Sequence, residues 1–68
     1  MRFRIEYLTE STEEDSVCHT LNSEARSLGG AAMEAQAGVG NVPHKVDGYQ
    51  IRDARAGGAI VLLRHLYL

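Results

Sequence analysis

Apolar and polar side chains alternate strictly at the start of the chain. Phe3, Ile5 and Tyr7 occupy every second position of residues 2–8, and charged side chains fill most of the positions between them. A period of two with aromatic and β-branched residues is typical of a strand that buries one face. The pattern therefore predicts a first strand over residues 2–8, with these three side chains directed inward.

A polar, acidic stretch follows at residues 9–16. Ser11 with Glu14, or Thr12 with Asp15, has the spacing of a capping box, in which a hydroxyl satisfies a free backbone N–H at a helix start. Acidic side chains also complement the positive end of the helix dipole. We interpret this stretch as the solvated start of a helix rather than as a site for a cation or a partner.

The next segment carries apolar residues at intervals of three and four, as one face of a helix does. These residues are Val17, Leu21, Ala25, Leu28, Ala32, Ala35 and Val39. Gly29 and Gly30 interrupt the run, and each glycine costs about 1 kcal/mol relative to alanine inside a helix. The helix either stops at Leu28 with Gly29 as its C-cap, or continues to Ala37. Because the apolar phase survives the interruption, we favour a continuous helix, bent or straight.

The rest of the chain, residues 38–68, is predicted to form a loop followed by a hairpin. Residues 38–48 contain the only proline and little periodicity, which indicates a connecting loop. Residues 49–53 alternate as a second strand, 54–58 have hairpin-turn length, and 59–68 form the longest and most apolar strand.

These elements predict one α+β domain over residues 1–68, with the order β-α-β-β. The most apolar strand favours the centre of a sheet, so we expect three antiparallel strands in the spatial order 1-3-2, a split β-α-β arrangement. One long helix packs on one face of that sheet. Tyr49 and Ile51 join the inward side chains of the first strand beneath the helix.

A single helix covers only one face, yet the last strand is apolar on both. We expect the side chains on its uncovered face to form an interface: Ile60, Leu62, Leu66 and Leu68. Burying one leucine or isoleucine is worth about 1.5–3 kcal/mol, and contiguous apolar exposure usually marks an association surface. The sequence therefore predicts a small soluble interaction module. We expect a homodimer formed through the uncovered sheet face or an edge strand, or another protein partner.

The charge distribution suggests an alternative. The 68 residues carry a net charge of −2, but acids gather at residues 10–15 and arginines lie on or near the strands. We place Arg2, Arg4, Arg52 and Arg64 on the helix-free face, as a candidate site for a nucleotide or single-stranded nucleic acid. The aromatic side chains needed for base stacking point to the opposite face, which argues against nucleic acid. Pairing of these arginines with Glu6 or with a partner's acids is the simpler interpretation.

No catalytic or metal-binding motif is evident. The chain has one cysteine and three histidines without zinc-ligand spacing. Cys18 and His19 are adjacent, so on a helix they do not form a hydrogen-bonded dyad by themselves. We therefore expect no cofactor, no metal and no enzyme activity, and no sequence motif indicates a family. No apolar run approaches the ~18 residues of a membrane span, and no export signal is visible, so we expect a cytoplasmic protein that does not enter membranes.

Overall fold

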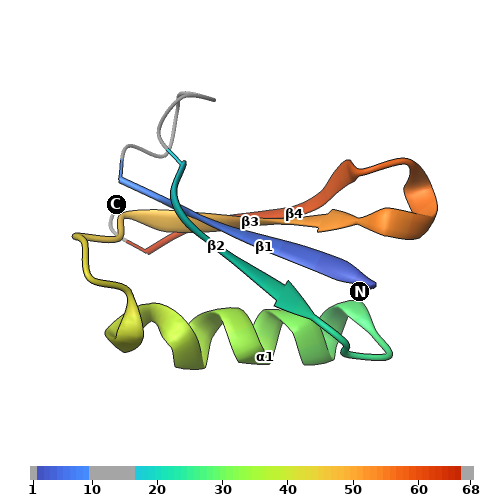
Figure 1. Ribbon diagram of the computed structural model, residues 1–68, viewed down its shortest axis with the longest axis horizontal. Coiled ribbons are helices and arrows are strands. Elements are labelled where there is room, and N and C mark those ends of the chain that lie inside the picture. Colours follow the sequence, from blue (N-terminus) through green and yellow to red (C-terminus); the bar gives the residue numbers. More distant parts are fainter. Residues whose placement is uncertain (1, 10–16, 67–68) are drawn as a thin grey trace.

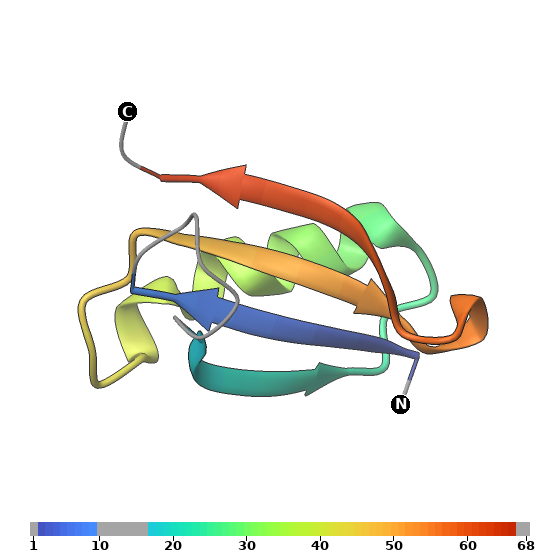
Figure 2. The ribbon, with the colours of Figure 1, turned by 90° about the horizontal axis from the view of Figure 1, so that it is seen from above.

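Among the residues that the structure describes, one helix packs against one face of a four-stranded antiparallel sheet (Figure 1). The computed structural model describes residues 2–9 and 17–66. The elements, in chain order, are β1 (Phe3–Leu8), β2 (Val17–Ser23), α1 (Leu28–Gly38), the 3-10 turn η2 (Val39–Asn41), β3 (Gly48–Asp53), the 3-10 turn η3 (Ala54–Ala56) and β4 (Ala59–His65). The strands lie in the order β2-β1-β3-β4, which can be followed in Figure 2.

The core lies between the helix and the two central strands. Ile5 pairs with Ile51, and Tyr7 pairs with Tyr49, so these four side chains share the face that α1 covers. All four are almost completely buried, as is Phe3. Ala31 and Ala35 of α1 are fully buried opposite them, because small side chains let the helix approach the sheet closely. The predicted inward face of residues 2–8 and 49–53 is therefore confirmed.

The segment Val17–Ser23 is a strand, and its prediction as a helix was wrong. It pairs with β1 in antiparallel register, with Leu21 opposite Ile5. A bulge between Tyr7 and Leu8 of β1 interrupts the register and leaves Cys18 of β2 without a direct partner. The topology is thus β-β-α-β-β. Of the helix start predicted at residues 9–16, residues 10–16 lie outside the described residues.

The helix runs through the glycine pair to Gly38, as the favoured interpretation expected, but it begins only at Leu28, so the part predicted before that residue was wrong. Ser27 has an extended backbone, with φ −140° and ψ 159°, and its side chain accepts a hydrogen bond from the backbone N–H of Gly30. That geometry makes Ser27 the N-cap. Gly29 and Gly30 consequently lie in the first turn, where they interrupt nothing. The C-terminal part of the predicted helix, up to Ala37, is therefore present.

The sheet order also differs from the predicted 1-3-2. The most apolar strand, β4, lies at an edge, and β1 is one of the two central strands, between β2 and β3. Because β2 forms a local hairpin with β1, the other side of β1 is taken by β3. The short connection after β3 then places β4 outside it. β1 and β3 are antiparallel, and the split β-α-β unit is made by β2, α1 and β3.

The connection between β3 and β4 is a short turn, as predicted. The Asp53 side chain accepts a hydrogen bond from the backbone N–H of Arg55, which starts η3. Gly57 and Gly58 then adopt φ angles of 68° and 83°, which glycine reaches without steric strain. In the part of the chain that the structure describes, no helix is long and apolar enough to cross a membrane.

Candidate interaction surfaces

The helix-free face of the sheet carries a polar cluster around Glu6. Gln50 lies directly opposite Glu6, and its side-chain amide donates to Glu6 Oε1 at 2.6 Å. The Nε of Arg52 donates to the same oxygen at 2.8 Å. Arg4 is more exposed, and its Nε lies 3.6 Å from Glu6 Oε2. The cluster therefore joins β1 to β3 through the Glu6 carboxylate, which accepts hydrogen bonds from Gln50 and Arg52.

Glu6 is 7% exposed, so its charge depends on these partners. Burial by itself would raise its pKa. The hydrogen bonds from Arg52 and Gln50, with the positive charges of Arg52 and Arg4, outweigh that effect and hold the pKa of Glu6 below its ordinary value. The carboxylate is therefore ionised at neutral pH, and it offsets part of the positive charge that Arg4 and Arg52 give to this face.

The four arginines predicted to share one face are separated. Arg4 and Arg52 are cross-strand partners on the helix-free face. Arg2 instead donates from Nη1 to the backbone carbonyl of Arg26, and its guanidinium lies 5.1 Å from the centre of the Phe3 ring. Arg64 is paired with Tyr49 and so projects from the helix side of β4. The structure thus gathers two of the four.

A bulge likewise divides the predicted interface residues. Leu62 pairs with Ile51 on the helix side, whereas Ile60 pairs with Arg52 on the helix-free side, because the register shifts between Ile51 and Arg52. Leu62 and Leu66 pack against the core, and Leu68 lies outside the described residues. The single apolar face expected for these four residues is therefore not formed.

A different apolar surface is present on the same strand. Ile60, Val61 and Leu63 are 45%, 39% and 50% exposed, and we refer to them as the β4 strip. Leu63 pairs with Gln50 on the helix-free face, and Val61 is the extra residue of the bulge. The strip therefore lies along the outer edge of the sheet, next to the Glu6 cluster.

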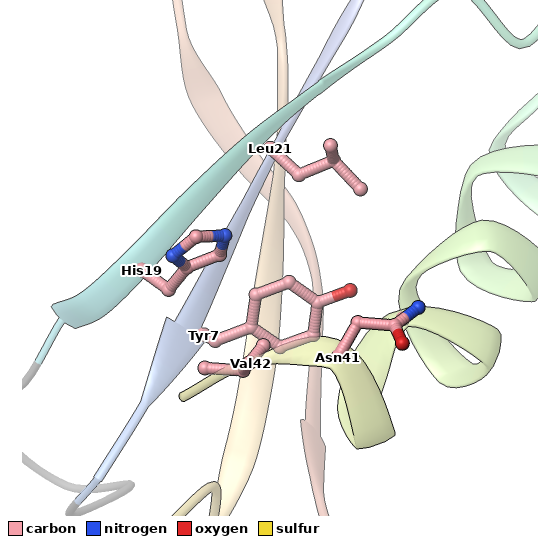
Figure 3. A pocket seen from close by; sticks show the side chains of 6 residues that line it. Tyr7, His19, Leu21, Asn41 and Val42 are labelled. Atoms are coloured by element: carbon pink, nitrogen blue, oxygen red, sulfur yellow. The ribbon is translucent and has the colours of Figure 1, made fainter. Parts of the chain in front are cut away.

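A second surface feature is a pocket between β2 and the end of α1, with a volume of about 130 Å³ (Figure 3). We refer to it as the β2–α1 pocket. His19 and Leu21 extend into it from β2, toward the side chains that follow the helix. Its lining residues are Tyr7, His19, Leu21, Gly38, Asn41 and Val42.

Tyr7 lines this pocket and is tied to α1 by a hydrogen bond. Its hydroxyl donates to the backbone carbonyl of Ala35 at 2.9 Å, and its ring lies 6.1 Å from that of His19. A Cβ at Gly38 would overlap the Tyr7 hydroxyl, so glycine permits the close approach of helix and ring. Burial, followed by the influence of Tyr49 and Glu34, raises the pKa of Tyr7, which keeps the hydroxyl protonated as a donor.

Sequence reasoning missed this pocket because it placed His19 and Leu21 on a helix. One available signal was composition: Val17 and Thr20 are β-branched, which favours a strand. Cys18 is a free, half-buried thiol that packs against the core.

The described residues contain no candidate metal centre, and the comparisons with known proteins identify no relative. Within residues 2–9 and 17–66, no three His, Cys, Asp or Glu side chains lie together in a group that could hold a metal ion. No family model, curated protein or solved structure matches the chain.

Proposed function

We propose that this protein is a homodimeric interaction module whose copies associate through β4. The observation that carries the proposal is the β4 strip: three large apolar side chains, each 39–50% exposed, on a strand whose outer edge pairs with no other strand that the structure describes. An edge strand with apolar side chains is a ready template for pairing with another chain unless charge, proline or a covering segment protects it. Its Arg64 projects from the opposite face, so it does not interrupt the strip.

A second copy of this chain is the occupant that fits best. Two β4 strands related by a two-fold axis would pair antiparallel, and each strip would then lie beside the other on one continuous face. Apolar side chains meet apolar side chains in that arrangement. The Glu6 cluster, which already neutralises much of its own charge, stays beside the interface rather than inside it.

The size of the strip sets the expected affinity. Each side chain is about half exposed, so full burial adds about 1 kcal/mol per residue, or about 6 kcal/mol for the three residues of both copies. Backbone hydrogen bonds between the strands add to this, and the loss of translational and rotational freedom opposes it. We therefore expect a weak dimer, with a dissociation constant between micromolar and millimolar.

Sedimentation velocity from about 10 µM to about 1 mM tests the proposal in that range. The wild-type chain should shift from monomer to dimer, and Leu63→Glu should remain a monomer because a charge is desolvated in the interface. Met33→Glu is the matched control, since Met33 is 75% exposed on α1, on the other side of the sheet. A monomeric wild type at the highest concentration, or equal dimerisation of Leu63→Glu, would contradict the proposal.

Binding of a nucleotide or single-stranded nucleic acid is the weaker candidate. The structure separates Arg2 and Arg64 from Arg4 and Arg52, and Glu6 pairs with the latter two. The aromatic rings of Phe3, Tyr7 and Tyr49 are buried, which leaves them unable to stack on bases. We place this hypothesis second for those reasons.

A further inference from the structure

We propose that the β2–α1 pocket and the outer edge of β2 together bind an extended peptide. The peptide would add to the sheet as a strand beside β2 and place one aliphatic side chain in the pocket. This site lies at the opposite edge of the sheet from the β4 strip, so it is independent of dimerisation.

The first support is the position of β2. It is an outermost strand of the described sheet, and its far side pairs with no strand among residues 2–9 and 17–66. His19, Thr20, Leu21 and Asn22 are all exposed. A strand edge of this kind supplies main-chain hydrogen bonds to an added strand, which give affinity with little dependence on sequence.

The second support is that the pocket lies directly beside this edge. His19 and Leu21 alternate along β2 on the helix side, and both line the pocket (Figure 3). Side chains of an added strand would alternate in the same way, so every second one would point toward α1. One of these side chains would enter the pocket between Leu21, Asn41 and Val42.

The third support is the size and chemistry of the pocket. A volume of about 130 Å³ is close to that of a cavity of about 150 Å³ that binds benzene, so it accommodates a leucine, isoleucine or valine side chain. None of its six lining residues is Asp, Glu, Lys or Arg. A charged side chain would lose hydration there without gaining an ion pair, which selects an aliphatic occupant. His19 and Asn41 can hydrogen-bond the peptide beside that side chain.

The test begins with peptides selected from a displayed library of random ten-residue sequences on the immobilised full chain. Selected peptides are synthesised and titrated into ¹⁵N-labelled protein. We expect the selected sequences to share a leucine, isoleucine or valine position, and the amide shifts to concentrate on residues 18–22 and 38–42. Replacing the shared residue by alanine should weaken binding at least about tenfold, as should N-methylation of the backbone amides that face β2.

Two variants of the protein separate this site from other surfaces. Leu21→Glu places a charge at the pocket, and Asn41→Lys places a longer, charged side chain there from η2, outside the strands. Each should weaken binding at least about tenfold, with the circular dichroism spectrum unchanged. Leu63→Glu is the matched control, because it makes the same exchange at the other edge and should leave peptide binding intact.

Three results would overturn the proposal. The first is that no peptide is enriched above background. The second is that the selected peptides shift amides away from β2 and the pocket, or bind the Asn41→Lys variant equally well. The third is that N-methylation has no effect, which would show that the backbone does not form a strand with β2.

Discussion

Replacing Gly48 by alanine should weaken the pairing of β3 and β4 more than any surface substitution. Gly48 is buried at the start of β3, opposite His65. A Cβ at this position would lie 2.5 Å from the Arg64 carbonyl oxygen, and 3.5 Å from both the Arg64 carbonyl carbon and the His65 Cα. All three atoms belong to the backbone. A change of rotamer therefore relieves none of the overlap, and the strands themselves must move apart.

The magnitude follows from that movement. Overfilling a packed site typically costs about 1–3 kcal/mol, and parting the strands also weakens their hydrogen bonds, so we expect a loss of about 2–3 kcal/mol. A chain of this length has a free energy of unfolding of about 3–10 kcal/mol, so the loss is a large share of the total. Because Gly48 has no positive φ angle, backbone strain contributes nothing to it.

Gly40→Ala is the matched control. A Cβ at Gly40 has no atom within 4 Å, and this glycine also has no positive φ angle. The substitution should therefore be neutral, or stabilising by about 0.4–1 kcal/mol through the unfolded state. Urea unfolding followed by far-ultraviolet circular dichroism measures both variants. If Gly48→Ala unfolds at the same urea concentration as Gly40→Ala, the close approach of β3 and β4 is refuted.

Two further predictions concern the polar groups that join the elements. Glu6→Gln should lower the free energy of unfolding by about 1–2 kcal/mol at about pH 7, because it removes the charge that Arg52 and Gln50 contact. The folded pKa of Glu6 is lowered, so this contribution is complete above about pH 5 and disappears as the pH falls through the folded pKa; a gap between variant and wild type that persists at about pH 2 would argue against it. Tyr7→Phe should cost about 1 kcal/mol through the lost bond to Ala35, as measured by thermal unfolding, and an unchanged midpoint would show that this bond contributes nothing.

The central strands could be predicted from the sequence because their alternation coincides with burial. Residues 3–8 and 48–53 carry aromatic and β-branched side chains at every second position, and those side chains meet beneath α1. The segment 17–23 could not be assigned in the same way. Val17 and Leu21 are four residues apart, which satisfies a helix as well as a strand. The pairing of Leu21 with Ile5 decides the outcome, and that contact is tertiary.

The positions of the candidate surface residues depend on a bulge in β4, which the alternation of apolar and polar residues does not reveal. Assigning Ile60 and Leu62 to one face assumes a regular strand. One bulge in β4 changes the phase, so Leu62 turns to the core while Ile60 stays in solvent. The β4 strip therefore includes Val61 and Leu63, which regular alternation places on the covered side. The β2–α1 pocket was not predicted because the sequence pattern assigns β2, which forms one of its walls, to the helix.

The position of β1 has a consequence for synthesis on the ribosome. β1 precedes all its neighbours in the chain, yet one of its two partners is β3, and Phe3 pairs with Asp53. Its hairpin with β2 can form early, but the apolar face stays uncovered until α1 and β3 emerge. At translation rates of about 5–20 residues per second, residues 24–53 take about 2–6 s to follow. During that interval the nascent chain presents three side chains that the finished protein buries almost completely beneath α1, Phe3, Ile5 and Tyr7.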